Sequence, residues 1–259
     1  MAGDAELLYE RRGAVALITF NRPQARNAMT FAMYEGLVAR CDEIDADDDV
    51  RVVVFRGAGG RAFVSGTDIR QFLDFDSGRT GVEYEADIDR YLGRLDRLGK
   101  PAIALVEGYA VGAGLSIAAA CDLRVCTPDA QFGLPVARTL GNCLSMTGYA
   151  RLVATLGESR AKDIVFTARM VSADEAHAAG LVSAVVPAEE IEAHVFELAE
   201  RVAGHAPITL RVTKEALRRL REANVPDGAD LVAEAYGSED FRQGVAAFLE
   251  KRRHTWTGS

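Results

Sequence analysis

Short apolar runs alternate with glycine turns and helical patterns along the first 160 residues or so. The clearest runs are residues 50–56 and 102–106, and neither alternates apolar with polar positions as a half-exposed strand does. Both are therefore predicted to be strands buried on two faces, as in parallel sheets that helices cover. A glycine-rich segment follows each run, and a helical pattern comes after it. This β–loop–α repetition predicts an α/β core.

The spacing of apolar residues and of turn residues predicts the other elements. Residues 7–10 and 14–20 are expected to form a β-hairpin, and Thr30 to cap an amphipathic helix within residues 29–44. Between them and the C-terminal part we expect a strand over 123–126 and helices over 88–98, 115–120 and 149–156. From about Ser159 onwards the pattern is helical, with helices expected over 159–167, 172–179, 188–205, 208–224 and 231–251.

The composition excludes several classes of protein. The 259 residues carry a net charge of −8, which argues against nucleic-acid binding because phosphate contacts need a concentrated basic face. The longest uncharged stretch, residues 108–121, is shorter than the roughly 18 residues of a membrane span, and the N-terminus lacks a secretory pattern. The four cysteines and four histidines form neither a CxxC nor an HExxH pattern, so no metal site is expected. We expect a reduced, cytoplasmic protein without membrane contact.

Gly112-Ala113-Gly114 lies between a predicted strand and a predicted helix. A dinucleotide fingerprint needs a third glycine where Ile117 stands, and residues 57–67 lack the Gly-Lys-Ser/Thr of a P-loop. What remains is a helix that starts at a glycine turn, with free main-chain N–H groups and the positive end of its dipole exposed. Such an end can hold an anion or a polarised carbonyl oxygen, although close packing alone also explains the glycines.

A second helix start is predicted where Ser65-Gly66-Thr67-Asp68 ends a short apolar run. Thr67 or Asp68 can cap a helix that enters at Ile69. If the two starts face each other, their main-chain N–H groups form a two-donor site for the oxygen of a thioester enolate.

Ser116 lies in a Gly-x-Ser-x-Ala string that loosely resembles the nucleophile elbow of acyl hydrolases. A hydrolase triad needs a histidine nearby, but His177, His194, His205 and His254 stand in no supporting motif. A serine at a helix start is the simpler interpretation, and acyl hydrolysis stays open as an alternative.

A set of short motifs stands in order along nearly the whole chain. They are Asn21-Arg22-Pro23 with Ala25 and Asn27-Ala28, Ala62-Phe63 with Ser65-Gly66-Thr67-Asp68-Ile69, Lys100-Pro101, Glu107-Gly108-Tyr109-Ala110-Val111-Gly112-Ala113-Gly114, Cys121-Asp122, Phe132-Gly133 with Pro135, and Glu239-Asp240-Phe241 with Gly244-Val245 and residues 248–252. Together they resemble the crotonase superfamily, the enoyl-CoA hydratase/isomerase family. The resemblance implies an α/β fold, with a crotonase-like, acyl-CoA-binding spiral core of ββα turns over residues 1–200 and a C-terminal helical trimerisation segment over residues 201–259.

The resemblance also implies a substrate and the residues that hold it. The substrate is an acyl-CoA, with coenzyme A as part of the substrate and no separate cofactor, and the chain assembles as a trimer or a dimer of trimers. The main-chain N–H groups of Thr67 and Ala113 form the oxyanion hole. The coenzyme A contacts that the resemblance implies are Arg26, Ala28, Ser65, Asp68, Ile69 and Arg70. Arg26 and the basic residues 251–253, the latter from a neighbouring subunit, are expected to meet the phosphates.

The sequence departs from the family where acid–base chemistry is expected. Hydratases of the family carry glutamates where Ser116 and Val136 stand, so we expect a poor hydratase. Other members place an aspartate near Asn142 or Cys143. Cys143 can act catalytically if Arg138 stabilises its thiolate, whereas packing as a small apolar residue is the alternative.

Three functions remain open at this point: an enoyl-CoA hydratase/isomerase-family enzyme, a hydrolase or isomerase of the same fold that uses Ser116, Cys143 or a bound water, and a non-catalytic acyl-CoA-binding paralogue. The apolar residues of the C-terminal helices are expected to pack across subunits, because a monomer would leave their side chains exposed to water. These residues are Val232, Tyr236, Phe241, Val245 and Phe248.

Overall fold

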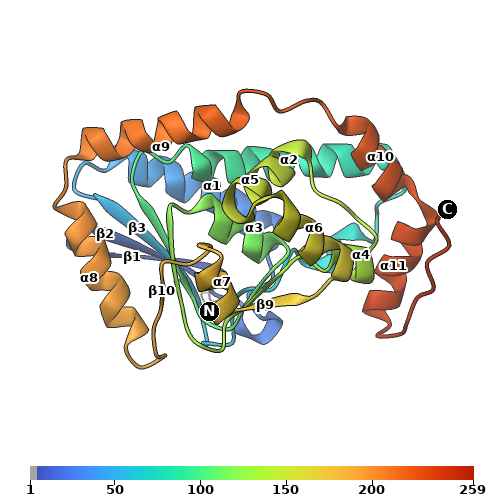
Figure 1. The fold of residues 1–259 in the computed structure, drawn as a ribbon, viewed down its shortest axis with the longest axis horizontal. Helices are drawn as coiled ribbons and strands as arrows, with labels where there is room; N and C mark the ends of the chain where they lie inside the picture. Colours follow the sequence, from blue (N-terminus) through green and yellow to red (C-terminus); the bar gives the residue numbers. More distant parts are fainter. Residues whose placement is uncertain (1–4) are drawn as a thin grey trace.

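Two β-sheets form the framework of the computed structural model, which describes residues 5–259 (Figure 1). The larger sheet has six strands, all parallel to their neighbours except the first two, which form the predicted hairpin. Its strand order is β1 (Leu7–Arg12), β2 (Val15–Phe20), β3 (Val52–Gly57), β5 (Ala102–Val106), β7 (Leu123–Cys126) and β10 (Ala184–Val185). As predicted, β5 is buried at every position and β3 at all but one.

The smaller sheet has four short strands and takes one from each turn of the chain. Its order is β4 (Ala62–Val64), β6 (Tyr109–Val111), β8 (Gln131–Gly133) and β9 (Met170–Ser172), with only β9 antiparallel to its neighbour. Along the chain, β3 leads to β4 and then to helix α2 (Gly78–Asp96), and β5 leads to β6 and then to α3 (Ala113–Ala120). The molecule is therefore a spiral of ββα turns, which confirms the predicted fold class.

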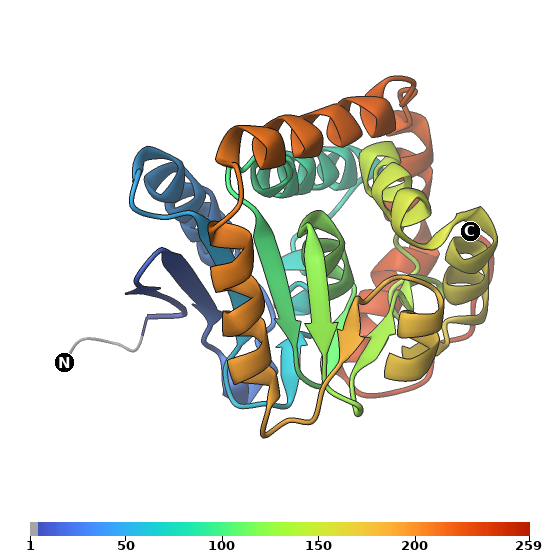
Figure 2. The ribbon, with the colours of Figure 1, turned by 60° about the vertical axis from the view of Figure 1, so that its left-hand side comes forward.

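Helices cover both faces of the larger sheet. Helix α8 (Ile191–Ala203) lies along one face, where it is the orange helix beside the strands in Figure 2. Helices α1 (Phe31–Ala46), α2 and α3 enclose the main core on the other side, and Thr30 caps α1 as predicted. The other helical elements are η1 (Pro23–Ala25), η2 (Ile69–Phe72), α4 (Val136–Thr139), α5 (Met146–Leu156), α6 (Glu158–Thr167), α7 (Ala173–Ala178), α9 (Pro207–Glu222), α10 (Ala229–Gly237) and α11 (Glu239–Leu249).

Several predicted boundaries are wrong, each for a local reason. Helix α2 begins at Gly78 instead of residue 88, because the Ser77 side chain caps it within a polar stretch. The single helix predicted over 231–251 is two helices, because Ser238 has an extended backbone that ends α10 and caps α11. The strands β6, β8, β9 and β10 escaped prediction because two or three residues cannot show a periodic pattern.

The C-terminal helices pack on their own chain. Helix α10 lies against α2, where a Cβ at Gly81 would stand only 2.2 Å from the Cβ of Tyr236. Val232, Tyr236, Phe241 and Val245 are all buried within the single chain. The expectation that these four residues need a partner subunit is therefore wrong, since α2, η2 and the loop before α5 already cover them, whereas Phe248 is 47% exposed.

Among residues 5–259, no helix combines the length and the apolar character needed to cross a membrane.

Candidate active site

Two glycine turns bring two free main-chain N–H groups together, as the sequence predicted. A Cβ on Gly112 would lie 3.6 Å from the Cα of Gly66, so the two turns are direct neighbours. The residues that follow them, Ala113 and Thr67, line the same cavity. Within residues 5–259, neither of their N–H groups donates a hydrogen bond. The pair is thus available to a ligand oxygen.

The glycines are required by the backbone path. Gly66 has φ +127° and Gly112 has φ +56°, both in the region that side chains disfavour. A Cβ at Gly114 would lie 1.9 Å from the Val64 carbonyl oxygen, so only glycine lets α3 start this close to β4. Asp68 caps the short helix η2, as predicted, by accepting a hydrogen bond from the Arg70 N–H.

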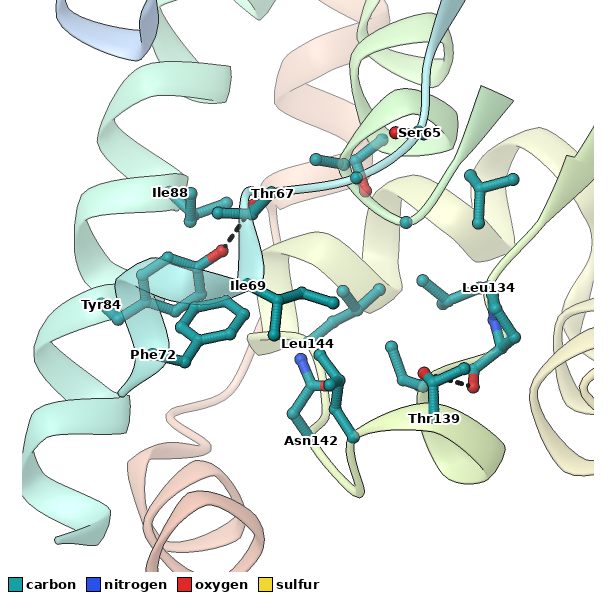
Figure 3. Close-up of a pocket in the computed structure, with 18 of the residues that line it drawn as sticks. Ser65, Thr67, Ile69, Phe72, Tyr84, Ile88, Leu134, Thr139, Asn142 and Leu144 are labelled. Carbon is teal, nitrogen blue, oxygen red and sulfur yellow. Dashed lines mark hydrogen bonds between the residues drawn. The ribbon is translucent and has the colours of Figure 1, made fainter. Parts of the chain in front are cut away.

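The cavity between these turns, α2 and α4 has a volume of about 140 Å³ and is mostly apolar (Figure 3). Its apolar walls come from five parts of the chain. They include Ile69, Phe72, Ile88, Val111, Leu134, Pro135, Val136, Leu140, Leu144 and Phe248. Engineered cavities of about 150 Å³ hold a benzene molecule, so this one suits a short acyl group.

Three hydroxyl groups stand in a row at one end of the cavity. The Thr67 Oγ1 lies 2.9 Å from the hydroxyl oxygens of both Tyr34 and Tyr84, and Figure 3 shows the second of these bonds. Burial raises the pKa of both tyrosines above their ordinary value, so both are neutral at pH 7. The side chain of Thr67 is thereby fixed against two buried tyrosines.

Ser116 and Val136 both line this cavity, at the positions where the resemblance placed glutamates. A carboxyl group is nonetheless present. Among the cavity residues that the structure describes, Glu85 of α2 is the one carboxylic acid, and none is a histidine. The triad expected of a serine hydrolase at Ser116 therefore finds no histidine partner in this cavity.

Glu85 is deeply buried and held at both oxygens. The Tyr236 hydroxyl donates to its Oε1 (2.6 Å) and the Ser145 N–H donates to its Oε2 (2.8 Å). The Asn142 side chain, which also lines the cavity, donates to the Tyr236 hydroxyl (3.2 Å). Burial raises the pKa of Glu85 to about 7, against the lowering effect of these hydrogen bonds. Its carboxyl group can therefore gain or lose a proton near neutral pH.

Cys143 does not behave as the sequence hypothesis required. It points away from the cavity, toward the Leu231 carbonyl oxygen at 3.9 Å. Burial, followed by the nearby Glu85 carboxylate, raises the pKa of its thiol to about 12, and Arg138 does not offset this. The thiolate expected beside Arg138 is therefore not supported, and Cys143 packs as a small apolar residue.

The residues that the resemblance assigned to coenzyme A gather beside the cavity. Ser65 and Ile69 line it, whereas Arg26, Ala28, Asp68 and Arg70 lie outside it. They belong to two adjoining segments, since the Ser65 N–H donates to the Arg26 carbonyl oxygen and the Arg22 guanidinium donates to the Ala28 carbonyl oxygen.

Asp68 is occupied by ion pairs. Arg70 and then Arg22 hold its carboxylate and keep its pKa down at about 2. Its role in the structure is thus to fix the turn that carries Thr67. The basic residues 251–253 follow Phe248, which lines the cavity, by three to five positions and are exposed.

Sequence reasoning missed Glu85, Tyr84 and Tyr34. The signal was hidden because α2 was predicted to start ten residues too late, which left Tyr84 and Glu85 in a polar loop.

In the part of the chain that the structure describes, no group of three or more metal-ligating side chains is placed to hold an ion.

Comparisons with known proteins agree with this geometry. The family model described as enoyl-CoA hydratase/isomerase matches residues 10–259. The short-chain-enoyl-CoA hydratase of Clostridium acetobutylicum is 34% identical over 251 residues, which cover 95% of either protein. A solved methylmalonyl-CoA decarboxylase in complex with 2-nitronate-propionyl-CoA has a TM-score of 0.90 at 26% identity, covering 98% of this chain and 99% of that one.

A solved monofunctional enoyl CoA isomerase from M. smegmatis is 34% identical with a TM-score of 0.70, covering 84% of this chain and 94% of that one. The match of the family model over nearly the whole chain carries the assignment. The chain therefore belongs to the enoyl-CoA hydratase/isomerase family of the crotonase superfamily.

Proposed function

We propose that this enzyme binds a short acyl-CoA thioester and stabilises the enolate that forms when its Cα loses a proton. The observation that carries the proposal is the pair of free N–H groups of Thr67 and Ala113 on two adjoining turns of one cavity. Donors fixed in this way stabilise a developing oxyanion without reorganising, which is worth about 3–4 kcal/mol per donor in well-studied enzymes.

We further propose that the reaction is proton transfer at Cα, as in a shift of the double bond, and that water addition is poor. Hydration needs one group to activate water and another to protonate Cα. The described walls of this cavity offer one carboxyl group, and one group suffices to take a proton from one carbon and return it to another. The similar isomerase from M. smegmatis supports this choice.

Coenzyme A is proposed to enter as part of the substrate, with no separate cofactor. Support comes from the adjoining segments that carry Arg26, Ala28 and Ser65, and from the similar decarboxylase, which was solved in complex with 2-nitronate-propionyl-CoA. Calorimetric titration with butyryl-CoA at low salt tests this step. Failure to detect binding at millimolar ligand would overturn the proposal.

The reaction is tested by mixing the enzyme with 3-butenoyl-CoA and following the absorbance of the conjugated enoyl thioester. We expect conjugation to appear with enzyme and not with enzyme heated beyond unfolding. Tight binding of the thioester without any conjugation or exchange of its α-protons would favour a non-catalytic acyl-CoA-binding protein.

Self-association is proposed through the outward face of α9. This helix turns charged residues toward the core, where Lys214 pairs with Asp122 at 2.7 Å and Arg221 with Asp96 at 2.9 Å. Apolar residues of its opposite side, Ile208, Val212 and Leu220, are exposed by 47% to 75%, and Leu217, at the edge of the charged side, is exposed by 62%. An apolar face on a helix that is anchored by its charged side is typical of an interface between subunits.

We propose a trimer or a dimer of trimers, as the family resemblance implies. Light scattering should give at least three times the chain mass of 27.9 kDa. The double variant Leu217→Glu, Leu220→Glu should lower this mass. Glu197→Gln, at an exposed position of α8, should not. A wild-type monomer at micromolar concentration would contradict the proposal.

The cytoplasm is the proposed compartment, because all four cysteines are free thiols and three of them are buried.

A further inference from the structure

Helix α2 carries two adjacent residues that reach the cavity, Tyr84 and Glu85. Tyr84 is hydrogen-bonded to the side chain of Thr67, the residue whose main-chain N–H is proposed to hold the thioester oxygen. The next residue along the helix, Glu85, lines the same cavity as Thr67 and Ala113. The reacting Cα is bonded to the thioester carbonyl carbon, so it lies in this cavity when the oxygen is bound.

No cation neutralises Glu85. The groups that face it are the acids Tyr34, Tyr84, Tyr149, Tyr236, Cys143 and Asp89, and among residues 5–259 no lysine or arginine forms an ion pair with it. Buried carboxylates are normally paired, because losing hydration is costly. A glutamine here would accept only one of the two hydrogen bonds, because its Nε2 donates and would face another donor, the Tyr236 hydroxyl or the Ser145 N–H.

Glu85 also lines a second, open groove on the other side of α2, together with Asp89 and Ser145. The Ser145 N–H donates to Glu85, and the Ser145 hydroxyl donates to the Asp89 carboxylate at 2.7 Å. The carboxyl group thus stands between the acyl cavity and a polar groove that is open to water. Protons can therefore be exchanged with solvent from the groove side.

We propose that Glu85 is the catalytic base and acid of this enzyme, in place of the family's glutamates at positions 116 and 136. The proposal rests on the enolate chemistry proposed above. The Glu85 carboxylate takes a proton from Cα, the C–H electron pair forms the enolate C=C bond, and the negative charge moves to the thioester oxygen between the Thr67 and Ala113 N–H groups. The protonated Glu85 then returns the proton to Cα, which gives exchange, or to Cγ of an enoyl substrate, which shifts the double bond.

Tyr236 is a positioning residue in this scheme. It comes from α10 and orients Oε1 of Glu85, while Asn142 orients Tyr236 in turn. Its hydrogen bond favours the ionised form of Glu85. Loss of the Tyr236 hydroxyl should therefore make the carboxyl group harder to ionise and move the pH midpoint of the reaction upward, which a merely structural contact would not do.

The test is the rate at which butyryl-CoA exchanges its α-protons in D₂O, measured by mass spectrometry. Wild-type exchange should rise with pH through about 7. Glu85→Gln should lower the rate by at least about 100-fold, the usual contribution of a positioned base, while calorimetry shows butyryl-CoA still bound. The matched control Glu83→Gln changes an exposed carboxyl group of the same helix and should keep the wild-type rate.

Each outcome decides between the two proposals. If the wild type exchanges and a folded Glu85→Gln exchanges equally fast, the role of Glu85 is overturned while the enolate proposal stands. If the wild type binds butyryl-CoA without exchange, the enolate proposal itself fails. Should Glu85→Gln not fold, Tyr236→Phe supplies the test: an unchanged pH midpoint of exchange would overturn the role, and an upward shift would support it.

Discussion

Helix α2 carries two deeply buried carboxyl groups whose surroundings are opposite. At its C-terminal end, Asp96 pairs with Arg151 of α5 at 2.6 Å and with Arg221 of α9 at 2.9 Å. Eleven residues earlier, Glu85 is equally buried, but within residues 5–259 no lysine or arginine pairs with it, although Arg90 and Arg97 line the same groove. The first arrangement holds three helices together, whereas the second leaves a carboxyl group that changes protonation near pH 7. Stability and chemistry are thus separated along a single helix.

The largest effect is expected at Asp96. Asp96→Asn should lower the free energy of unfolding by about 3–5 kcal/mol, because it leaves two guanidinium groups without their shared carboxylate. Urea unfolding at pH 7 measures this loss. Glu83→Gln is the control, because it removes an exposed ion pair with Arg79 that contributes at most about 0.5 kcal/mol to the free energy of unfolding. A loss no larger than that of the control would show that Asp96 is not the anchor described.

The effect of Glu85→Gln on stability should depend on pH. The pKa of Glu85 is raised from 4.5 to about 7. Below pH 4.5 its carboxyl group is therefore protonated in both the folded and the unfolded chain, and its ionisation does not change the free energy of unfolding. As pH rises through 7 the folded protein must ionise a buried group, and stability is lost. The stability of Glu85→Gln relative to wild type should therefore increase by about 3 kcal/mol between pH 4.5 and pH 8.

Urea unfolding of both proteins at the two pH values measures this difference. A variant that is equally destabilised at pH 4.5 and pH 8 would indicate a purely structural glutamate. Glu83→Gln, again, should show no comparable dependence on pH.

The smallest effect is expected from Tyr236→Phe. The hydroxyl of Tyr236 donates to Glu85, and a hydrogen bond to a charged group contributes about 1.5–3 kcal/mol. The loss should be greater at pH 8, where Glu85 is ionised, than at pH 5, where it is neutral. Equal losses at both pH values would mean that the bond does not favour the ionised form.

Each of the two glycine turns leaves a local signature in the sequence, but only the family resemblance predicted that the N–H groups of Thr67 and Ala113 act as a pair. The turns at Gly66 and Gly112 need backbone angles that few other residues adopt, and the residue after each turn is then fixed in position. The buried strands β3 and β5 and the Thr30 cap follow from equally local rules.

Glu85 could not be predicted in the same way, because its environment is made by distant segments. Whether a residue of α2 meets the cavity depends on Tyr236 of α10 and on the loop at Ser145, which are 151 and 60 residues away in the chain. The burial of Val232 and Phe241 likewise depends on how α10 and α11 fold back on α2 and η2. Local periodicity carries no information about such contacts.

The central claim is that this cavity moves protons at Cα and adds water poorly, and incubation of the wild type with crotonyl-CoA in D₂O tests it most directly. One sample reports both reactions by mass spectrometry: deuterium entering the enoyl chain, and formation of the hydrated 3-hydroxy product. Because the α-hydrogen of crotonyl-CoA is vinylic, deuterium enters through loss of a Cγ proton, which gives the same dienolate as loss of a Cα proton from 3-butenoyl-CoA. We expect this deuterium to enter well before hydrated product accumulates. Hydration with a kcat on the order of 10 s⁻¹ or more, as in ordinary enzymes, together with little deuterium in the remaining substrate, would contradict the account.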